Sequence, residues 1–163
     1  MGRRVASAGT PATVLLSKLG VPYRTLSYVH DPSAEHYGTE AAEKLAVDPA
    51  QVFKTLMVDV GTQLAVAVVP VNRTLNLKAM GAACGSKRAA MADRAAAERR
   101  TGYVIGGISP LGQRHRSPLV LDESALAFDA ILVSGGRRGL EIELAPADLL
   151  RATDGTTAAL ASD

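Results

Sequence analysis

Val52-Phe53-Lys54-Thr55-Leu56-Met57-Val58-Asp59-Val60 is the stretch around which the rest of the chain can be placed. It is rich in β-branched and apolar residues, which predicts a β-strand. Side chains alternate between the faces of a strand, so Phe53 and Met57 share one face and Lys54 opens an apolar row on the other. Burying an unpaired ammonium group is costly. Lys54 therefore either reaches solvent, as most lysines do, or serves an anionic ligand.

The segments on either side of this strand extend the prediction. Gly61-Thr62 predicts a hairpin turn into a second strand over 63–70, whose almost continuous apolar run is typical of a central strand covered on both faces. Asp48-Pro49 predicts one turn of helix, because aspartate caps helices and proline suits the first helical position. Further helices are predicted over 11–19, 39–46, 77–84 and 146–150, and after Ser86 and Asp93. Further strands are predicted over 21–29, 103–105, 119–121, 130–134 and 139–144, and the tail after Thr153 is expected to fray.

This pattern of short strands in hairpins with short helices between them predicts an α+β fold. We expect a mixed or antiparallel curved sheet rather than a parallel βαβ sheet. The length of 163 residues fits a single domain over 1–163 with its core over about 10–150. No window approaches the run of about 18 apolar residues that spans a bilayer. The start of the chain lacks the apolar region of a signal peptide, and the single cysteine, Cys84, excludes an intramolecular disulfide, so we expect a cytoplasmic protein.

Positive charge is concentrated in short clusters, although the net charge is only +2. Such clusters are either solvated faces of helices or surfaces that contact phosphates. The candidate RNA-binding residues are Lys87, Arg88, Arg114, Arg116, Arg137 and Arg138.

The run Gly106-Gly107-Ile108-Ser109-Pro110-Leu111-Gly112 is a second distinctive feature. It matches neither the Walker A pattern nor the dinucleotide fingerprint. Two adjacent glycines either let backbone N–H groups approach a ligand closely or form a tight turn. The three histidines lack metal-ligand spacing, Cys84 is expected to be a small buried side chain, and the chain has no Gly-x-Ser-x-Gly elbow. The sequence therefore predicts neither a metal site nor a catalytic triad.

Seven stretches follow one another along roughly residues 10–150. They are Thr10-Pro11-Ala12, Tyr28-Val29-His30-Asp31-Pro32, Tyr37-Gly38 with Glu40-Ala41-Ala42, Val52-Phe53-Lys54-Thr55-Leu56, 66–71, 101–112 and 134–144. Their ordered combination resembles the YbaK/EbsC family, and in particular its YbaK branch of Cys-tRNA(Pro) deacylases. Arg137 departs slightly from the family pattern, which has a lysine-type residue there, and keeps the charge.

The resemblance implies a barrel-like mixed sheet surrounded by helices, and it implies trans-editing. In that activity cysteine is removed by hydrolysis from mischarged tRNA(Pro), beside prolyl-tRNA synthetase. Editing is needed because a pocket separates amino acids that differ by one methylene-sized group by only about 1–3 kcal/mol. The resemblance makes Lys54 the key active-site residue, and no cofactor, metal, membrane or DNA is expected. The other candidate substrate-binding residues are Tyr23, Tyr28, Thr55, Gly106, Gly107, Ser109 and Glu141.

A mechanism without a catalytic base suits this substrate. The cysteine thiol can attack its own ester carbonyl, releasing the tRNA and leaving a cyclic thiolactone, with proximity lowering the barrier. Lys54 and the N–H groups around Gly106 and Gly107 suit binding of the developing oxyanion. Two alternatives stay open: a deacylase for another amino acid such as alanine, and a non-catalytic RNA- or nucleotide-binding module.

Overall fold

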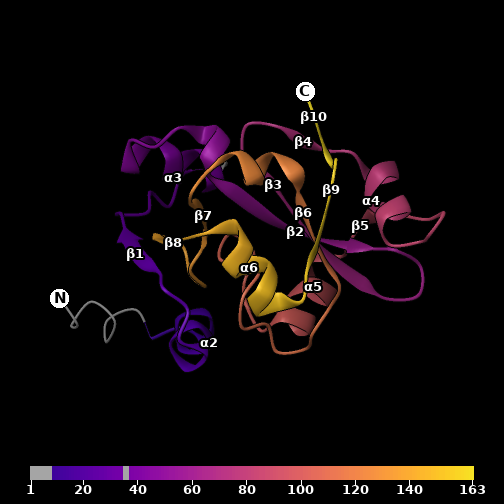
Figure 1. Cartoon of the computed structure of the whole chain (residues 1–163), viewed down its shortest axis with the longest axis horizontal. Coiled ribbons are helices and arrows are strands. Elements are labelled where there is room, and N and C mark those ends of the chain that lie inside the picture. The colour runs from indigo at the N-terminus through magenta and orange to yellow at the C-terminus, as the bar shows by residue number, and fades with distance from the viewer. Residues whose placement is uncertain (1–8, 35–36) are drawn as a thin grey trace.

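The computed structural model describes residues 9–34 and 37–163, and Figure 1 shows how the helices and strands are arranged. The α-helices are α2 (Pro11–Leu19), α3 (Tyr37–Leu45), α4 (Leu77–Ala83), α5 (Arg94–Thr101) and α6 (Pro146–Thr153), and the 3-10 helices are η1 (Pro49–Gln51) and η2 (Glu123–Ala127). The strands are β1 (Arg24–Ser27), β2 (Phe53–Asp59), β3 (Leu64–Pro70), β4 (Thr74–Leu75), β5 (Ala90–Met91), β6 (Leu119–Asp122), β7 (Ile131–Ser134), β8 (Leu140–Leu144), β9 (Thr156–Ala158) and β10 (Ala161–Ser162). The expected α+β class is confirmed. No helix within the described ranges is long and apolar enough to cross a membrane.

In the described part of the chain the strands form three sheets, with the orders β5-β2-β3-β6-β9, β1-β8-β7 and β10-β4. The largest sheet is mixed, because β2 runs antiparallel to β3 and β5, whereas β6 runs parallel to β3 and β9. A bridge between Val52 and Leu132 joins the start of β2 to β7, so two of the sheets meet there. The mixed sheet is as expected, but the strands of the described residues do not close into one continuous barrel.

The paired strands β2 and β3 separate two hydrophobic cores. Phe53 and Met57 of β2 pack in the larger core with Val68 of β3. Val58 packs in a second core with Val69 of β3. This division follows from the alternation of side chains along a strand. The prediction of a doubly covered central strand is confirmed, since burial runs through almost the whole of β3.

Several predicted helix ends are confirmed by their caps. Thr10 accepts a hydrogen bond from the N–H of Thr13 at the start of α2, and Asp48 does the same for Ala50 at η1. Thr10 Oγ1 also donates to the carbonyl of Gly135 at 2.5 Å, which ties α2 to the turn between β7 and β8. Local capping chemistry thus sets the element ends and one of the long-range contacts near the site.

Some predicted elements are wrong in place or length. Residues 103–105 form a turn, in which the hydroxyl of buried Tyr103 donates to the carbonyl of Leu111 at 2.7 Å. No helix follows Ser86, whose hydroxyl donates to the carbonyl of Val60 and holds the loop before β5. The strand predicted over 21–29 is only β1, because Pro22 has no N–H for a sheet. The helix expected over 39–46 spans 37–45, and the last helix continues to Thr153.

The tail after Thr153 pairs with other strands, so the prediction that it frays is wrong. β9 runs beside β6, and β10 runs beside β4 near the C-terminus in Figure 1. Leu160 is fully buried. Asp122, at the end of β6, accepts hydrogen bonds from the N–H groups of Leu160 and Ala161 at 2.8 and 2.9 Å. The composition of this segment predicts no strand, so its order comes from partners that are distant in sequence.

Candidate active site

A pocket of about 320 Å³ lies at the start of β2. Its walls come from the first residues of β2, from the end of β7 and the start of β8, from the first turn of α3, and from Ile105, Gly106 and Ile108. The volume falls within the range of pockets that hold small ligands. The polar side chains that line it belong to Tyr28, Thr39, Lys54, Thr55, Ser134 and Glu141.

Lys54 lies inside this pocket instead of pointing away from the protein. Its backbone pairs with that of Val69 on the buried central strand, so its position is fixed by the sheet. Burial lowers the pKa of Lys54, because removing water disfavours the charged amine. The structure thus places Lys54 where a ligand in the pocket would contact it.

Two further polar groups of the pocket, the Glu141 carboxyl and the Thr55 hydroxyl, are buried. Glu141 is only 7% exposed, and this burial raises its pKa to about 8, so the carboxyl is largely protonated at neutral pH. Thr55 Oγ1 is buried and has no hydrogen-bond partner among the described residues. Buried polar groups are usually paired, so the Thr55 hydroxyl and the perturbed Glu141 carboxyl at the pocket wall point to a polar ligand.

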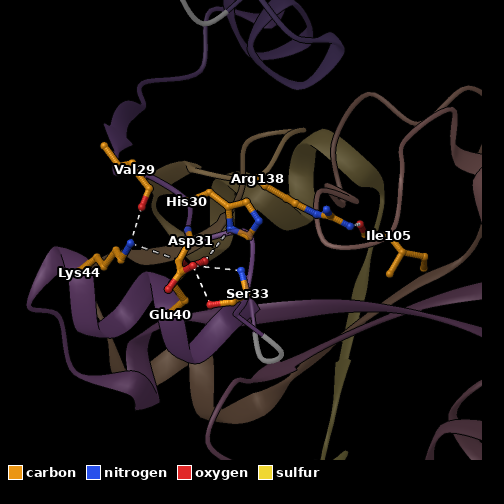
Figure 2. Close-up of polar contacts among 8 residues, drawn as sticks. All are labelled: Val29, His30, Asp31, Ser33, Glu40, Lys44, Ile105 and Arg138. Carbon is orange, nitrogen blue, oxygen red and sulfur yellow. Dashed lines mark hydrogen bonds and ion pairs between the residues drawn. The ribbon is translucent and has the colours of Figure 1, made fainter.

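A second buried carboxylate, Glu40, follows the pocket residue Thr39 in α3, and Figure 2 shows its polar contacts. Its Oε1 contacts His30 Nδ1 at 2.8 Å, and its Oε2 accepts a hydrogen bond from the N–H of Asp31 at 2.7 Å. Lys44, one turn along α3, lies 3.4 Å from Oε2 and also donates to the carbonyl of Val29. Burial alone would raise the pKa of Glu40, but the hydrogen bonds from Asp31 and His30 outweigh it and lower the pKa. Glu40 therefore acts as an ionised bridge between α3 and loop 29–31.

This bridge holds together two parts of the pocket wall. Tyr28 comes directly before the loop, and Thr39 lies in the first turn of α3. Burial and the nearby carboxyl groups of Glu141 and Glu40 raise the pKa of Tyr28 to about 12, so its hydroxyl keeps its proton. The wall thus offers a neutral phenol in the pocket that Lys54 also lines.

The comparison with protein families places this pocket in a known context. The family model described as the aminoacyl-tRNA editing domain matches residues 31–152, a range that includes Lys54, Gly106 and Glu141. The chain belongs to the aminoacyl-tRNA editing domain family. The resemblance to the YbaK/EbsC family is confirmed by this match and by a close relative.

That relative of the editing domain is a protein of Enterococcus faecalis named EbsC, a Cys-tRNA(Pro)/Cys-tRNA(Cys) deacylase. It is 37% identical over 158 residues, which cover 95% of this chain and 94% of the relative. A solved structure named as a trans-editing enzyme for prolyl tRNA synthetase has a TM-score of 0.84 at 22% identity, covering 96% of this chain and 98% of that one. The structure of hypothetical protein APE2540 has a TM-score of 0.83 at 25% identity, covering 94% and 100%. At these identities the two solved structures support the fold.

Three candidate substrate-binding residues lie outside the pocket of the editing domain. The hydroxyl of Tyr23 lies 3.0 Å from Ser17 Oγ on α2, where the two form a hydrogen bond. Ser109 is fully buried, and its Oγ accepts from the N–H of Leu111. Gly107 lies behind Gly106, and a Cβ atom there would come within 2.8 Å of the Cα of Arg137. Gly107 is therefore needed for close backbone packing, whereas Gly106 lines the pocket.

Sequence reasoning missed some pocket residues of the editing domain. Ser134 faces Glu141 in the register of β7 and β8, and it lines the pocket. It opens the stretch 134–144 that carried the family resemblance, so its place before two glycines was a usable signal. Thr39 also lines the pocket, but nothing in its local sequence distinguishes it.

The candidate RNA-binding residues of the editing domain lie in different places. Arg138 donates from Nη2 to the carbonyl of Ile105, at the pocket wall, at 2.6 Å. Arg116 pairs with Asp154 at 2.8 Å. Arg88 instead lies against Gly61, in the turn at the far end of β2 from Lys54. Within residues 9–34 and 37–163, no three histidine, cysteine or acidic side chains are placed to hold a metal ion.

Proposed function

We propose that this chain hydrolyses mischarged Cys-tRNA(Pro) in the cytoplasm, acting in trans on tRNA that prolyl-tRNA synthetase has charged with cysteine. The proposal rests above all on Lys54, a half-buried lysine in the pocket of a chain that belongs to the editing family. The name and 37% identity of the relative EbsC support cysteine as the amino acid removed.

The polar groups of the pocket suit the parts of an aminoacyl ester. The α-ammonium group of cysteine fits beside Glu141 and Thr55, because a cation would let the buried carboxyl ionise and would satisfy the unpaired hydroxyl. Lys54 then faces the ester carbonyl. Its charge stabilises the negative charge that develops on the carbonyl oxygen, which is where preorganised electrostatics lower a barrier most.

The substrate supplies the nucleophile in this scheme. The cysteine sulfur forms a bond to its own carbonyl carbon while the carbon–oxygen bond to the terminal ribose breaks. The thiol proton is transferred to the departing ribose oxygen, and water then opens the thiolactone to free cysteine. Attack within one molecule needs no side-chain base, since proximity alone can supply several kcal/mol. The protein binds and orients the aminoacyl ester and stabilises the negative charge that develops on its carbonyl oxygen.

Deacylation of three substrates tests the proposal. The purified chain is incubated with Cys-tRNA(Pro), Ala-tRNA(Pro) and Pro-tRNA(Pro), each with and without prolyl-tRNA synthetase. We expect rapid release of cysteine, little release of alanine, and intact Pro-tRNA(Pro). Preferred release of alanine would overturn the assignment in favour of an alanine deacylase. Binding of all three without release would instead identify a non-catalytic module.

A further inference from the structure

We propose that Glu98 and Arg138 are positioning residues, which hold the peptide between Ile105 and Gly106 so that the N–H of Gly106 donates into the pocket. The acceptor is the carbonyl oxygen of the aminoacyl ester, on which negative charge develops when the ester is attacked. The inference rests on the proposed function, because it takes its acceptor from that substrate. Neither positioning side chain is among the described residues that line the pocket, so both act through the backbone.

A turn over 104–107 brings backbone groups to the pocket wall. Ile105 and Gly106 both line the pocket. Gly106 has a φ of +92°, the sign that the third residue of a type II turn requires and that glycine adopts without strain. The N–H of Gly107 donates to the carbonyl of Val104 at 2.9 Å, which closes the turn. Of the two glycine N–H groups expected to bind an oxyanion, that of Gly107 is therefore already engaged within the protein.

Glu98 on α5 fixes the N–H side of Ile105. Its Oε2 accepts a hydrogen bond from the Ile105 N–H at 2.8 Å. An ionised acceptor makes this bond stronger than one to a neutral oxygen. The helix is itself held in place, because its neighbouring residue Ala97 is buried in the larger core and Asp93 caps its first turn. Glu98 thus connects the turn to a packed helix.

Arg138 fixes the carbonyl side of the same residue. Its Nη2 donates to the carbonyl of Ile105 at 2.6 Å, and Figure 2 shows the guanidinium pointing toward Ile105. Arg138 belongs to the turn between β7 and β8, which packs closely on the glycine pair. A Cβ atom at Gly107 would lie 2.8 Å from the Cα of Arg137 and 3.2 Å from the backbone nitrogen of Arg138. Two segments distant in sequence therefore hold Ile105 from opposite ends of its backbone.

These contacts determine the direction of the Gly106 N–H. The carbonyl of Ile105 and the N–H of Gly106 belong to one planar trans peptide, in which the two groups point in opposite directions. With the carbonyl directed at Arg138, the N–H is directed away from it. Within residues 9–34 and 37–163 the Gly106 N–H donates to no protein acceptor. It is therefore free for a ligand in the pocket that Lys54 also lines, as a donor whose orientation is set before the substrate binds.

Arg94 provides a matched control on the same helix. Its Nε lies 3.5 Å from Glu98 Oε2, and its side chain is 68% exposed. Such exposed ion pairs contribute little free energy. Arg94→Gln therefore removes the charge beside Glu98 and leaves the hydrogen bond from Ile105 in place.

Steady-state deacylation of Cys-tRNA(Pro) tests the inference on the reaction. For Glu98→Ala we expect kcat about 10- to 100-fold lower and KM within about threefold of wild type, because a donor to the developing charge is misplaced. Glu98→Gln keeps an oxygen that can accept from the Ile105 N–H, so its kcat should return to within a few-fold of wild type. Arg94→Gln should match wild type. A raised KM at unchanged kcat, or a Glu98→Gln variant as slow as Glu98→Ala, would overturn the inference.

Amide hydrogen exchange in the free protein separates this inference from the proposed function. We expect the Ile105 amide to exchange slowly and the Gly106 amide quickly, and Glu98→Ala to speed exchange at Ile105 by about tenfold or more. Glu98→Gln should not. Equal exchange at Ile105 in wild type and Glu98→Ala refutes the positioning role even if Cys-tRNA(Pro) is cleaved. The expected exchange in a wild-type protein that cleaves no Cys-tRNA(Pro) supports the positioning role and refutes the proposed function.

Arg138→Met tests the same peptide from its carbonyl side. Arg138 makes further contacts besides that to Ile105, so the variant is combined with Glu98→Ala in a double-mutant cycle. Since both residues act on one peptide, the double variant should lose less in kcat than the product of the two single losses. Losses that multiply contradict the inference. If circular dichroism shows Glu98→Ala to be unfolded, Arg138→Met decides alone, and a wild-type kcat in that folded variant rejects the inference.

Discussion

Glu141 connects stability to pH. Burial raises the pKa of its carboxyl from 4.5 to about 8. Between these values the folded chain holds a proton that the unfolded chain has lost. The free energy of unfolding therefore falls as pH rises through this window, by a few kcal/mol at most.

We predict that Glu141→Gln removes this dependence, because an amide of the same size does not ionise in this range. Unfolding in urea at pH 5, 7 and 9 should show a variant whose stability changes less across the window than that of wild type. At pH 9 the Glu141→Gln variant should be more stable than wild type. Stability curves that run parallel from pH 5 to 9 would contradict the assigned protonation of Glu141.

We predict that a substitution at Lys54 lowers activity without lowering the stability of the fold. Lys54→Met keeps the aliphatic stem and removes the ammonium group, whose pKa burial lowers. We expect a folded protein at least as stable as wild type, with deacylation slower by about 10²- to 10³-fold, as when an oxyanion-binding donor is lost. Single-turnover rates and thermal unfolding measure the two effects. Wild-type turnover would exclude a catalytic role for Lys54.

Among the elements, α3 and loop 29–31 depend on each other through Glu40. We predict that Glu40→Gln raises the KM for Cys-tRNA(Pro) more than it lowers kcat. The loop that follows Tyr28 loosens, while Lys54 on β2 stays in place. Glu40→Ala should have a larger effect and destabilise the fold by about 1–3 kcal/mol, since the partly buried hydrogen bond from the N–H of Asp31 to the Glu40 carboxylate is lost.

Glu43→Gln is the matched control, because Glu43 lies on the same helix and is exposed. It should leave KM, kcat and stability near wild type. A uniform fall in kcat without a change in KM in Glu40→Gln would show that Glu40 acts on the chemical step and does not position the wall.

The elements also show what local sequence can reveal. Thr10, Asp48 and Asp93 were recognisable as caps, because capping depends on a few neighbouring residues. The run after Thr153 was not recognisable as strand. Its order comes from Asp122, β4 and β6, which are distant in sequence, so no local propensity carries the signal.

At the scale of the whole molecule, the pocket also shows which features could be predicted from the sequence and which could not. Lys54, Thr55, Tyr28, Gly106 and Glu141 were expected together from the ordered family stretches, and all five line one pocket. Tyr23, Gly107 and Ser109 lie in the same stretches or near them, but they face other parts of the fold. Whether a residue of these stretches lines the pocket depends on how β2, β8 and α3 pack together, and local sequence does not specify that packing.

The proposed reaction predicts a difference between two nearly isosteric substrates. Ser-tRNA(Pro) carries a hydroxyl where Cys-tRNA(Pro) carries a thiol. A thiol with a pKa of about 8.5 is partly ionised at neutral pH and a hydroxyl is not, so we expect the seryl ester to bind similarly but to be cleaved far more slowly. Single-turnover rates at saturating enzyme measure this. Equal rates would require a water nucleophile and a base from the protein, with His30 and Glu141 as the first candidates.

The pairing of the last strands affects how this chain is made. Until residues 156–162 have been synthesised, β6 and β4 present unpaired edges, Asp122 lacks two of its donors, and the site of Leu160 is open to water. Unpaired edges are where nascent chains associate with one another. The second core therefore stays open until residues 156–162 are available to pair, well after β2 and β3 have been made.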